Sequence, residues 1–207
     1  MAENDDSGTA DTGVGTAVVK KLRRVYSGFL NLDEAVVSHP RYDGGRQTVT
    51  RLSLERGDSV ALLMVDRKAR KVWLTEQFRY PTLAKGPGWI AELPAGTVDA
   101  GEEPDETARR EAGEETGVVP AALERVASFY VSPGGTSERI ILYYAAVDGA
   151  RRDMQMAART RDPDEDIKLI EQDLDEFMAE ARLGRVDDAK TLIGGLWLLA
   201  NRKRLGV

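Results

Sequence analysis

The sequence predicts an α/β sandwich built around a mixed β-sheet. Three observations predict it: runs of alternating and β-branched residues separated by turn signals, one short helix bounded by glycines among these runs, and further helical patterns nearer the C-terminal end. Strands before and after a single helix, with other helices behind them, place a sheet between helical layers.

Each element follows from a local pattern. Turn signals at Asp43-Gly44-Gly45 and Arg56-Gly57-Asp58 separate the early runs. The expected strands are 24–32, 47–55, 59–66, 71–78, 90–93, 123–130, 140–147 and 167–171. The expected helices are 103–116, 174–182 and 188–204. The last helix carries a wide apolar stripe that indicates core or subunit packing rather than a cofactor site.

Composition bounds the chemistry. With 207 residues, 42% of them apolar and 31% charged, the chain is large enough for one domain with a proper core. A net charge of −6 argues against a nucleic acid as the main partner. The absence of cysteine excludes thiol chemistry. The single histidine, His39, is expected in a surface turn, and a zinc site of the two-histidine kind is excluded. Carboxylates must therefore serve as the general acid, the general base and the metal ligands.

The N-terminal segment differs from the rest of the chain. Residues 1–17 are small, polar and acidic, so we expect a disordered tail followed by a single domain over 18–207. This segment has neither the basic nor the apolar part of a signal peptide, and no apolar run is long enough to span a membrane. We therefore expect a cytoplasmic protein without a membrane partner.

The segment 96–118 carries the strongest signal. Pro104, the acidic Asp105 and Glu106, and a final Gly117 suit the start and end of a helix over 103–116. Helical spacing places Glu111, Glu114 and Glu115 on or beside one face, where like charges repel unless a cation lies between them. Such a face is a candidate platform for Mg²⁺ or Mn²⁺, because both ions prefer hard oxygen ligands. The alternative is a solvated acidic face with Arg110 as its ion-pair partner.

The whole segment resembles the Nudix box, and every fixed position is filled. These positions are Gly96, Glu102, Arg110, Glu111, Glu114, Glu115 and Gly117. The runs TEQFRYP, WIAELPAG, SPGGTSER, DPDEDI and GRVDDAKTLIGGLWL are similar to the ADP-ribose pyrophosphatase branch of that family. The resemblance covers nearly all of residues 26–199. It implies the Nudix α/β/α sandwich with an N-terminal antiparallel β segment, about residues 18–57, that serves dimerisation and nucleotide binding.

The resemblance also implies roles for box residues. The backbone carbonyl of Ala95 and the carboxylates of Glu111 and Glu115 would bind the metal. Glu114 and Glu102 would ligate it directly or through neighbouring groups, and Arg110 would orient the carboxylates by ion pairing.

Substrate contacts are implied outside the box. Arg79 would meet the diphosphate or the terminal ribose, because an arginine fork matches phosphate oxygens. Arg51 and Arg56 fall where the family binds the nucleotide, and Phe29 would stack on the base from the partner subunit. The terminal ribose would be lined by Ser132, Pro133, Gly134 and Glu138.

Two positions depart from the family pattern. Our candidate for the general base, or for a further metal ligand, is Glu165; in some relatives the base lies two residues earlier, where this chain has Pro163, so Asp162 and Asp164 remain alternatives. Leu52 stands where relatives tend to carry a glutamate that reads the purine edge. A leucine cannot accept a hydrogen bond, so the nucleotide base that the protein recognises stays open.

The resemblance implies a homodimeric hydrolase that uses Mg²⁺, or alternatively Mn²⁺, to cleave ADP-ribose into AMP and ribose 5-phosphate. One alternative is a pyrophosphatase for GDP-mannose or another nucleotide sugar, whose branch shares the SPGG and DEDI segments. A second alternative is a non-catalytic Nudix domain that senses such a nucleotide, although such proteins usually have a damaged box and this one is intact.

Overall fold

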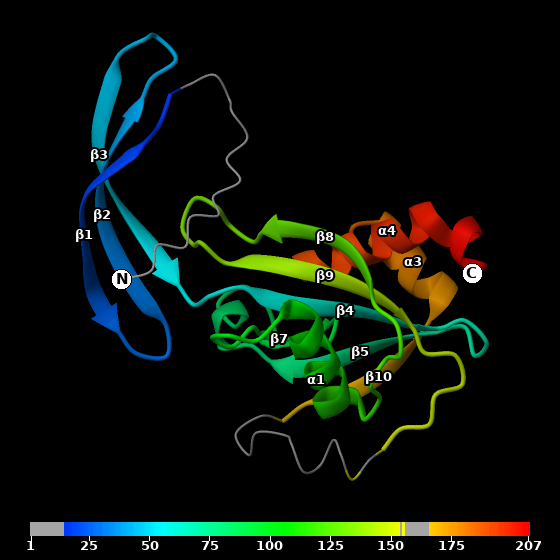
Figure 1. Cartoon of the computed structure of the whole chain (residues 1–207). Coiled ribbons are helices and arrows are strands. Elements are labelled where there is room, and N and C mark those ends of the chain that lie inside the picture. The colour runs from blue at the N-terminus through cyan, green and yellow to red at the C-terminus, as the bar shows by residue number, and fades with distance from the viewer. Residues whose placement is uncertain (1–14, 154, 156–165) are drawn as a thin grey trace. The chain divides into compact units, whose positions relative to one another are not determined.

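The computed structural model describes residues 15–153, 155 and 166–207, which form two compact units (Figure 1). Of the described residues, one unit contains 15–56 together with Gly134–Ser137. The other contains Gly57–Pro133 and Glu138–Val207. Most of the expected tail, and the candidate bases Asp162, Asp164 and Glu165, lie outside the described residues.

The first unit is a three-stranded antiparallel sheet in the order β1–β2–β3. Its strands are β1 (Val18–Ser27), β2 (Asn31–Pro40) and β3 (Arg46–Glu55). The turn between β2 and β3 follows the Asp43-Gly44-Gly45 pattern: Asp43 accepts a hydrogen bond from the Gly45 amide at 3.1 Å, and Gly44 has φ of 86°. A positive φ is easily adopted only by glycine, so this predicted turn is confirmed.

Two expectations for this unit were wrong. The strand expected at 24–32 is interrupted, because the chain turns between Ser27 and Asn31. Residues that favour strands lie on both sides of this turn, so the sequence pattern predicts one continuous strand. His39, expected in a surface turn, belongs to β2 and lies opposite Gln47 of β3. Pairing with a neighbour on each side extends β2 beyond what its own sequence predicts.

The second unit is built on a mixed sheet in the order β10–β5–β4–β9–β8, with β6 pairing β5 and β7 pairing β4. The pair β4–β9 is parallel and the other strand pairs are antiparallel. The strands are β4 (Ser59–Asp66), β5 (Lys71–Phe78), β6 (Trp89–Glu92), β7 (Ala95–Thr97), β8 (Glu124–Tyr130), β9 (Arg139–Ala146) and β10 (Lys168–Asp173). The short β7 was not expected from the sequence.

Helices cover both faces of this sheet (Figure 1). They are α1 (Pro104–Thr116), α3 (Leu174–Arg182) and α4 (Ala189–Leu205). Strand β4 is buried throughout and alternates between the two sides. Leu62 packs in the cluster that contains Ala108 and Ala112 of α1, whereas Leu63 packs in the cluster that contains Phe177 of α3 and Leu198 of α4. The predicted α/β/α sandwich with a mixed sheet is therefore confirmed. Within the described ranges, no helix has the length and apolar character needed to cross a membrane.

Candidate active site

Helix α1 is fixed at both ends. Pro104 occupies its first turn with two acidic residues, and Gly117 ends it in the left-handed conformation with φ of 75°. A Cβ at Gly117 would lie 2.7 Å from the carbonyl oxygen of Asp153, so only glycine fits there. Near its start, Asp105 accepts a 2.5 Å hydrogen bond from the Tyr143 hydroxyl of β9. Burial and this carboxylate raise the pKa of Tyr143 to about 12, so the hydroxyl stays protonated and ties α1 to the sheet.

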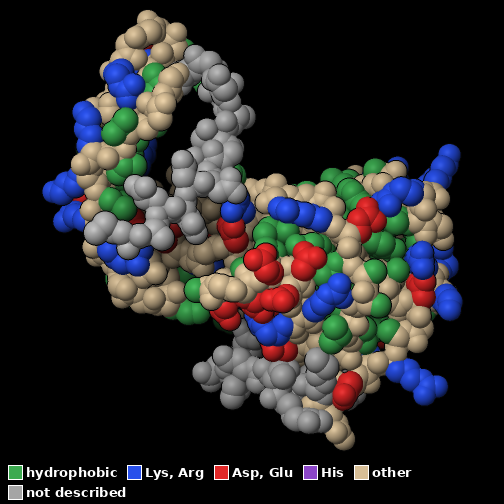
Figure 2. All heavy atoms as spheres, viewed as in Figure 1, with side chains coloured by type: hydrophobic (Ala, Val, Ile, Leu, Met, Phe, Trp, Pro, Cys, Tyr) green, Lys and Arg blue, Asp and Glu red, His purple; other side chains and the backbone are tan. Residues whose placement is uncertain are grey.

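Arg110 lies among the acidic residues of the box. Its Nε and Nη2 each donate to one oxygen of Glu102 at 3.1 Å. Its Nη1 donates to Glu111 at 2.8 Å and to Glu114 at 3.3 Å. One guanidinium thus holds three carboxylates and offsets the repulsion expected among like charges on this face. Figure 2 shows acidic side chains gathered over α1 and β7 with basic side chains beside them.

This arrangement keeps the Glu102 carboxylate ionised. The hydrogen bonds from Arg110 hold the pKa of Glu102 at about 2, and the same contacts raise the pKa of Arg110. Glu102 is therefore negative across the whole neutral range.

Glu111 lies directly against the main chain of β7. A Cβ built on Gly96 would come within 1.9 Å of both the carboxyl carbon and one oxygen of Glu111. The residue at position 96 must therefore be glycine if the carboxylate is to reach this place. The contact brings Glu111 beside the peptide that follows Ala95, so two of the expected metal ligands belong to neighbouring segments.

The oxygen donors of the expected metal ligands suit a hard divalent cation that also binds substrate phosphates. Glu111, Glu115 and the Ala95 carbonyl offer oxygen atoms, and Glu115 is only 7% exposed. Within the described ranges, acidic, histidine and cysteine side chains form no group of three or more that could enclose a metal ion by themselves. Mg²⁺ is often held by one or two carboxylates plus substrate phosphates and water, so this incomplete set fits such an ion.

Four expected substrate residues lie in the same unit as the box. Arg79 follows β5, and its Nε donates to Glu92 of β6 at 2.8 Å. Glu138 accepts a hydrogen bond from Ser59 Oγ at 2.8 Å, which places its side chain at the start of β4. Ser132 and Pro133 lie between β8 and β9.

The other four belong to the first unit. Phe29 lies in the β1–β2 turn and is 94% exposed. Arg51 lies on β3, where its Nη1 donates to the Thr50 carbonyl at 3.0 Å. Arg56 follows β3, and Gly134 belongs to this unit through the segment Gly134–Ser137.

Sequence reasoning missed a buried ionic cluster. Glu92 and Lys190 are 3% and 7% exposed and form an ion pair. A charged residue inside each of the apolar runs WIAEL and AKTLIGGL is the signal that could have revealed it, because buried charges require partners.

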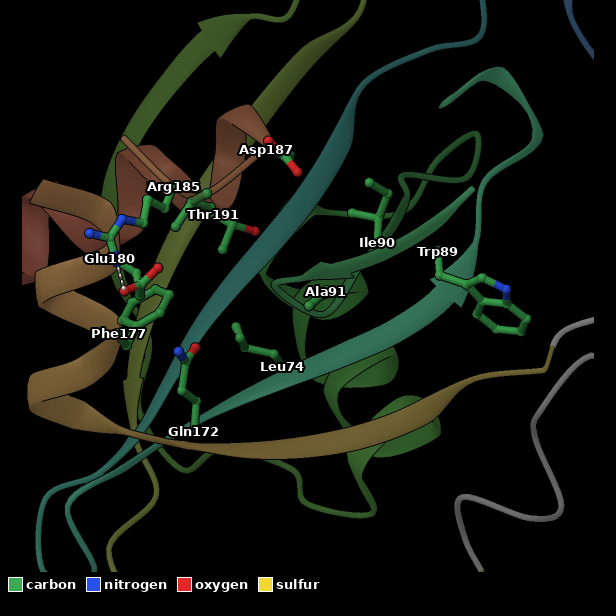
Figure 3. A pocket seen from close by; sticks show the side chains of 11 residues that line it. Leu74, Trp89, Ile90, Ala91, Gln172, Phe177, Glu180, Arg185, Asp187 and Thr191 are labelled. Carbon is green, nitrogen blue, oxygen red and sulfur yellow. Dashed lines mark hydrogen bonds and ion pairs between the residues drawn. The ribbon is translucent and has the colours of Figure 1, made fainter. Parts of the chain in front are cut away.

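A pocket of about 200 Å³ lies on the other side of the sheet from α1 (Figure 3). Leu74 of β5, Phe177 of α3 and Thr191 of α4 line it, together with the ion pair between Glu180 and Arg185. No box residue lines this pocket, so it is separate from the expected metal platform.

The family follows from comparison with known proteins. The family model described as NUDIX domain matches residues 55–192 of the chain. The chain belongs to the NUDIX domain family. The membership expected from the box, among the Nudix hydrolases, is thereby confirmed.

Two relatives of this Nudix protein carry different names. This chain is 35% identical over 164 residues to a GDP-mannose pyrophosphatase of Pectobacterium atrosepticum, and the match covers 78% of this chain and 83% of that protein. It is 32% identical over 188 residues to an ADP-ribose pyrophosphatase of Haemophilus influenzae, covering 87% of this chain and 85% of that protein. The two resemblances are of similar strength, so identity alone does not choose between the names.

A solved structure has a similar fold. The crystal structure of an ADP compounds hydrolase superposes with a TM-score of 0.73, covering 93% of this chain and 97% of that one. The sequences are 15% identical, so the likeness concerns the fold alone.

Proposed function

We propose that this Nudix protein hydrolyses the diphosphate bond of ADP-ribose, giving AMP and ribose 5-phosphate, with Mg²⁺ as its metal. The observation that carries the reaction type is the intact box, in which Gly96 receives the Glu111 carboxylate and Arg110 holds Glu102, Glu111 and Glu114. The substrate is proposed from the similarity of the TEQFRYP and WIAELPAG segments to the ADP-ribose branch.

The metal would be held by Glu111, Glu115 and the Ala95 carbonyl. When bound, it would neutralise charge on the diphosphate oxygens and lower the pKa of a bound water. Arg110 holds Glu111, one of these ligands, together with Glu102 and Glu114, so the position of this carboxylate does not have to form during the reaction.

Residues of this chain would bind and activate the reactants. Arg79 would donate hydrogen bonds to the diphosphate, and Ser132, Pro133, Gly134 and Glu138 would contact the terminal ribose. Glu165, or in its place Asp164 or Asp162, would accept a proton as the oxygen of water bonds to phosphorus. The bridging P–O bond breaks on the opposite side, and its electrons leave with the second phosphate.

Rates on a panel of substrates test this function. With Mg²⁺ present, we expect ADP-ribose to give the highest kcat/KM among ADP-ribose, GDP-mannose, ADP-glucose and NADH, and we expect EDTA to abolish turnover. A clear preference for GDP-mannose would contradict the substrate but not the reaction. Absence of metal-dependent turnover on every substrate would contradict the reaction itself and favour a nucleotide sensor.

We also propose that the protein is a homodimer in which Phe29 reaches the partner's nucleotide. Strand β1 is an edge strand whose apolar side chains are exposed, including Val19 at 60%, Leu22 at 64% and Tyr26 at 61%. An edge strand with exposed apolar residues is a surface that another chain can cover.

Multi-angle light scattering measures the assembly directly. We expect the mass of two chains at micromolar concentration, and we expect Phe29→Ala to raise KM while leaving that mass unchanged. A stable monomer with full activity would contradict both the dimer and the role of Phe29.

A further inference from the structure

Glu92, the last residue of β6, is a buried carboxylate between two cations. One of its oxygens accepts from Arg79 Nε at 2.8 Å, and the other accepts from Lys190 Nζ. The side chains of Glu92 and Lys190 are 4% and 9% exposed, whereas that of Arg79 is 41% exposed. The cluster therefore begins in the interior and ends at the surface in a guanidinium.

The buried side of this cluster is anchored to the start of α4. Asp188 caps that helix: it accepts hydrogen bonds from the amide and the hydroxyl of Thr191 at 2.9 Å and 2.6 Å, and from Lys190 Nζ at 3.0 Å. The Thr191 hydroxyl oxygen in turn accepts from the amide of Leu93 at 2.9 Å. Leu93, which follows Glu92, and Lys190, which binds Glu92, are thus both tied to the N-terminus of α4.

This anchoring restricts Arg79 in a specific way. A guanidinium is planar, so fixing its Nε–H also fixes the directions of its four terminal N–H groups. Among the described residues, Nε is the one nitrogen of this guanidinium with a protein hydrogen-bond partner. The terminal nitrogens remain able to bind two oxygens of a phosphate side by side.

The formal charges of the cluster balance, so the cluster as a whole does not repel an anion. Glu92 and Asp188 contribute two negative charges, Lys190 and Arg79 two positive ones, and the N-terminus of α4 adds a partial positive charge. Without Lys190, Glu92 would largely cancel the charge of Arg79. Lys190 binds the second oxygen of Glu92, so the cluster can hold the arginine without repelling a diphosphate.

We propose that Glu92, itself held by Lys190, is a positioning residue that orients Arg79 toward the substrate diphosphate. The proposal rests on the proposed function, because it assigns Arg79 to the diphosphate of a nucleotide sugar. Glu92 acts through Arg79 and makes no contact with substrate.

A double-mutant cycle on ADP-ribose separates positioning from general structural support. We expect Glu92→Gln to raise KM about tenfold with kcat changed less than about twofold, because an oriented charge-assisted contact to the bound substrate is lost. We expect Arg79→Ala to raise KM further. Adding Glu92→Gln to Arg79→Ala should then change KM by less than about twofold, since no arginine remains to be positioned.

Melting temperature and a matched control complete the experiment. Asp148→Asn removes the ion pair to Arg67 elsewhere in the same unit and should leave KM unchanged. If Glu92→Gln does not fold, Glu92→Asp replaces it in the cycle, because this variant keeps the buried negative charge that balances Lys190 but shortens the side chain and weakens its hold on Arg79.

The outcomes distinguish the two proposals. Wild-type protein without turnover on any nucleotide sugar would overturn the proposed function. Wild-type turnover with equal KM effects of the Glu92 variant in both Arg79 backgrounds, or a lower melting temperature with an unchanged KM, would overturn the positioning role alone.

Discussion

Replacing Glu115 by glutamine is expected to lower kcat on ADP-ribose by about a thousandfold while the protein stays folded. Glu115 lies on α1, four residues after Glu111, and is 7% exposed. Glutamine has nearly the same shape, so the packing of α1 against the sheet should persist. It carries no negative charge, however, and a neutral amide is a weak ligand for a hard divalent cation.

Three measurements check this result: kcat at saturating Mg²⁺, the metal affinity by calorimetry, and the melting temperature. Glu106→Gln is the matched control, because Glu106 is an exposed glutamate in the first turn of the same helix. We expect Glu106→Gln to keep the wild-type rate. A Glu115→Gln variant with kcat within a few-fold of wild type would show that the metal is held elsewhere.

The box was predictable from the sequence because its signals are local. Pro104 and Gly117 mark the ends of a helix through backbone preferences that hold in any fold, and helical spacing then places Glu111 and Glu115 on one face. The structure adds that Arg110 binds three carboxylates at once. The sequence suggested its ion pairing but not that a single guanidinium holds all three.

Features that depend on tertiary contacts were not predictable in the same way. No local pattern says that Glu111 lies against Gly96, because the contact joins a helix to a strand. The burial of Glu92 and Lys190 likewise depends on β6 meeting the start of α4. Strand β2 was missed because its length is set by pairing with β1 and β3, and its own residues, His39 among them, also suit a turn.

Replacing Gly96 by alanine is expected to lower kcat/KM on ADP-ribose about a hundredfold, an effect comparable to the loss of an outer-shell partner at a metal site. The new methyl group would lie 1.9 Å from the Glu111 carboxyl carbon, whereas carbon atoms in contact lie at about 3.5–4.0 Å. The carboxylate must therefore move. Gly96 is not among the residues with positive φ, so alanine can adopt its backbone conformation. The substitution thus displaces Glu111 without straining β7.

The fold should tolerate this change because the displaced group is the end of a flexible side chain that is 14% exposed. We expect a loss of about 1 kcal/mol in the free energy of unfolding, the common size for a single substitution. Gly86→Ala is the matched control: its new Cβ would meet its nearest neighbour, the Thr82 carbonyl, at an ordinary 3.7 Å, and its activity should match wild type. The decisive measurement adds Glu111→Gln to each background. If Gly96→Ala acts by displacing the carboxylate, Glu111→Gln should cost far less activity in the alanine background than in wild type; equal losses in both would show that Gly96 serves the site in another way.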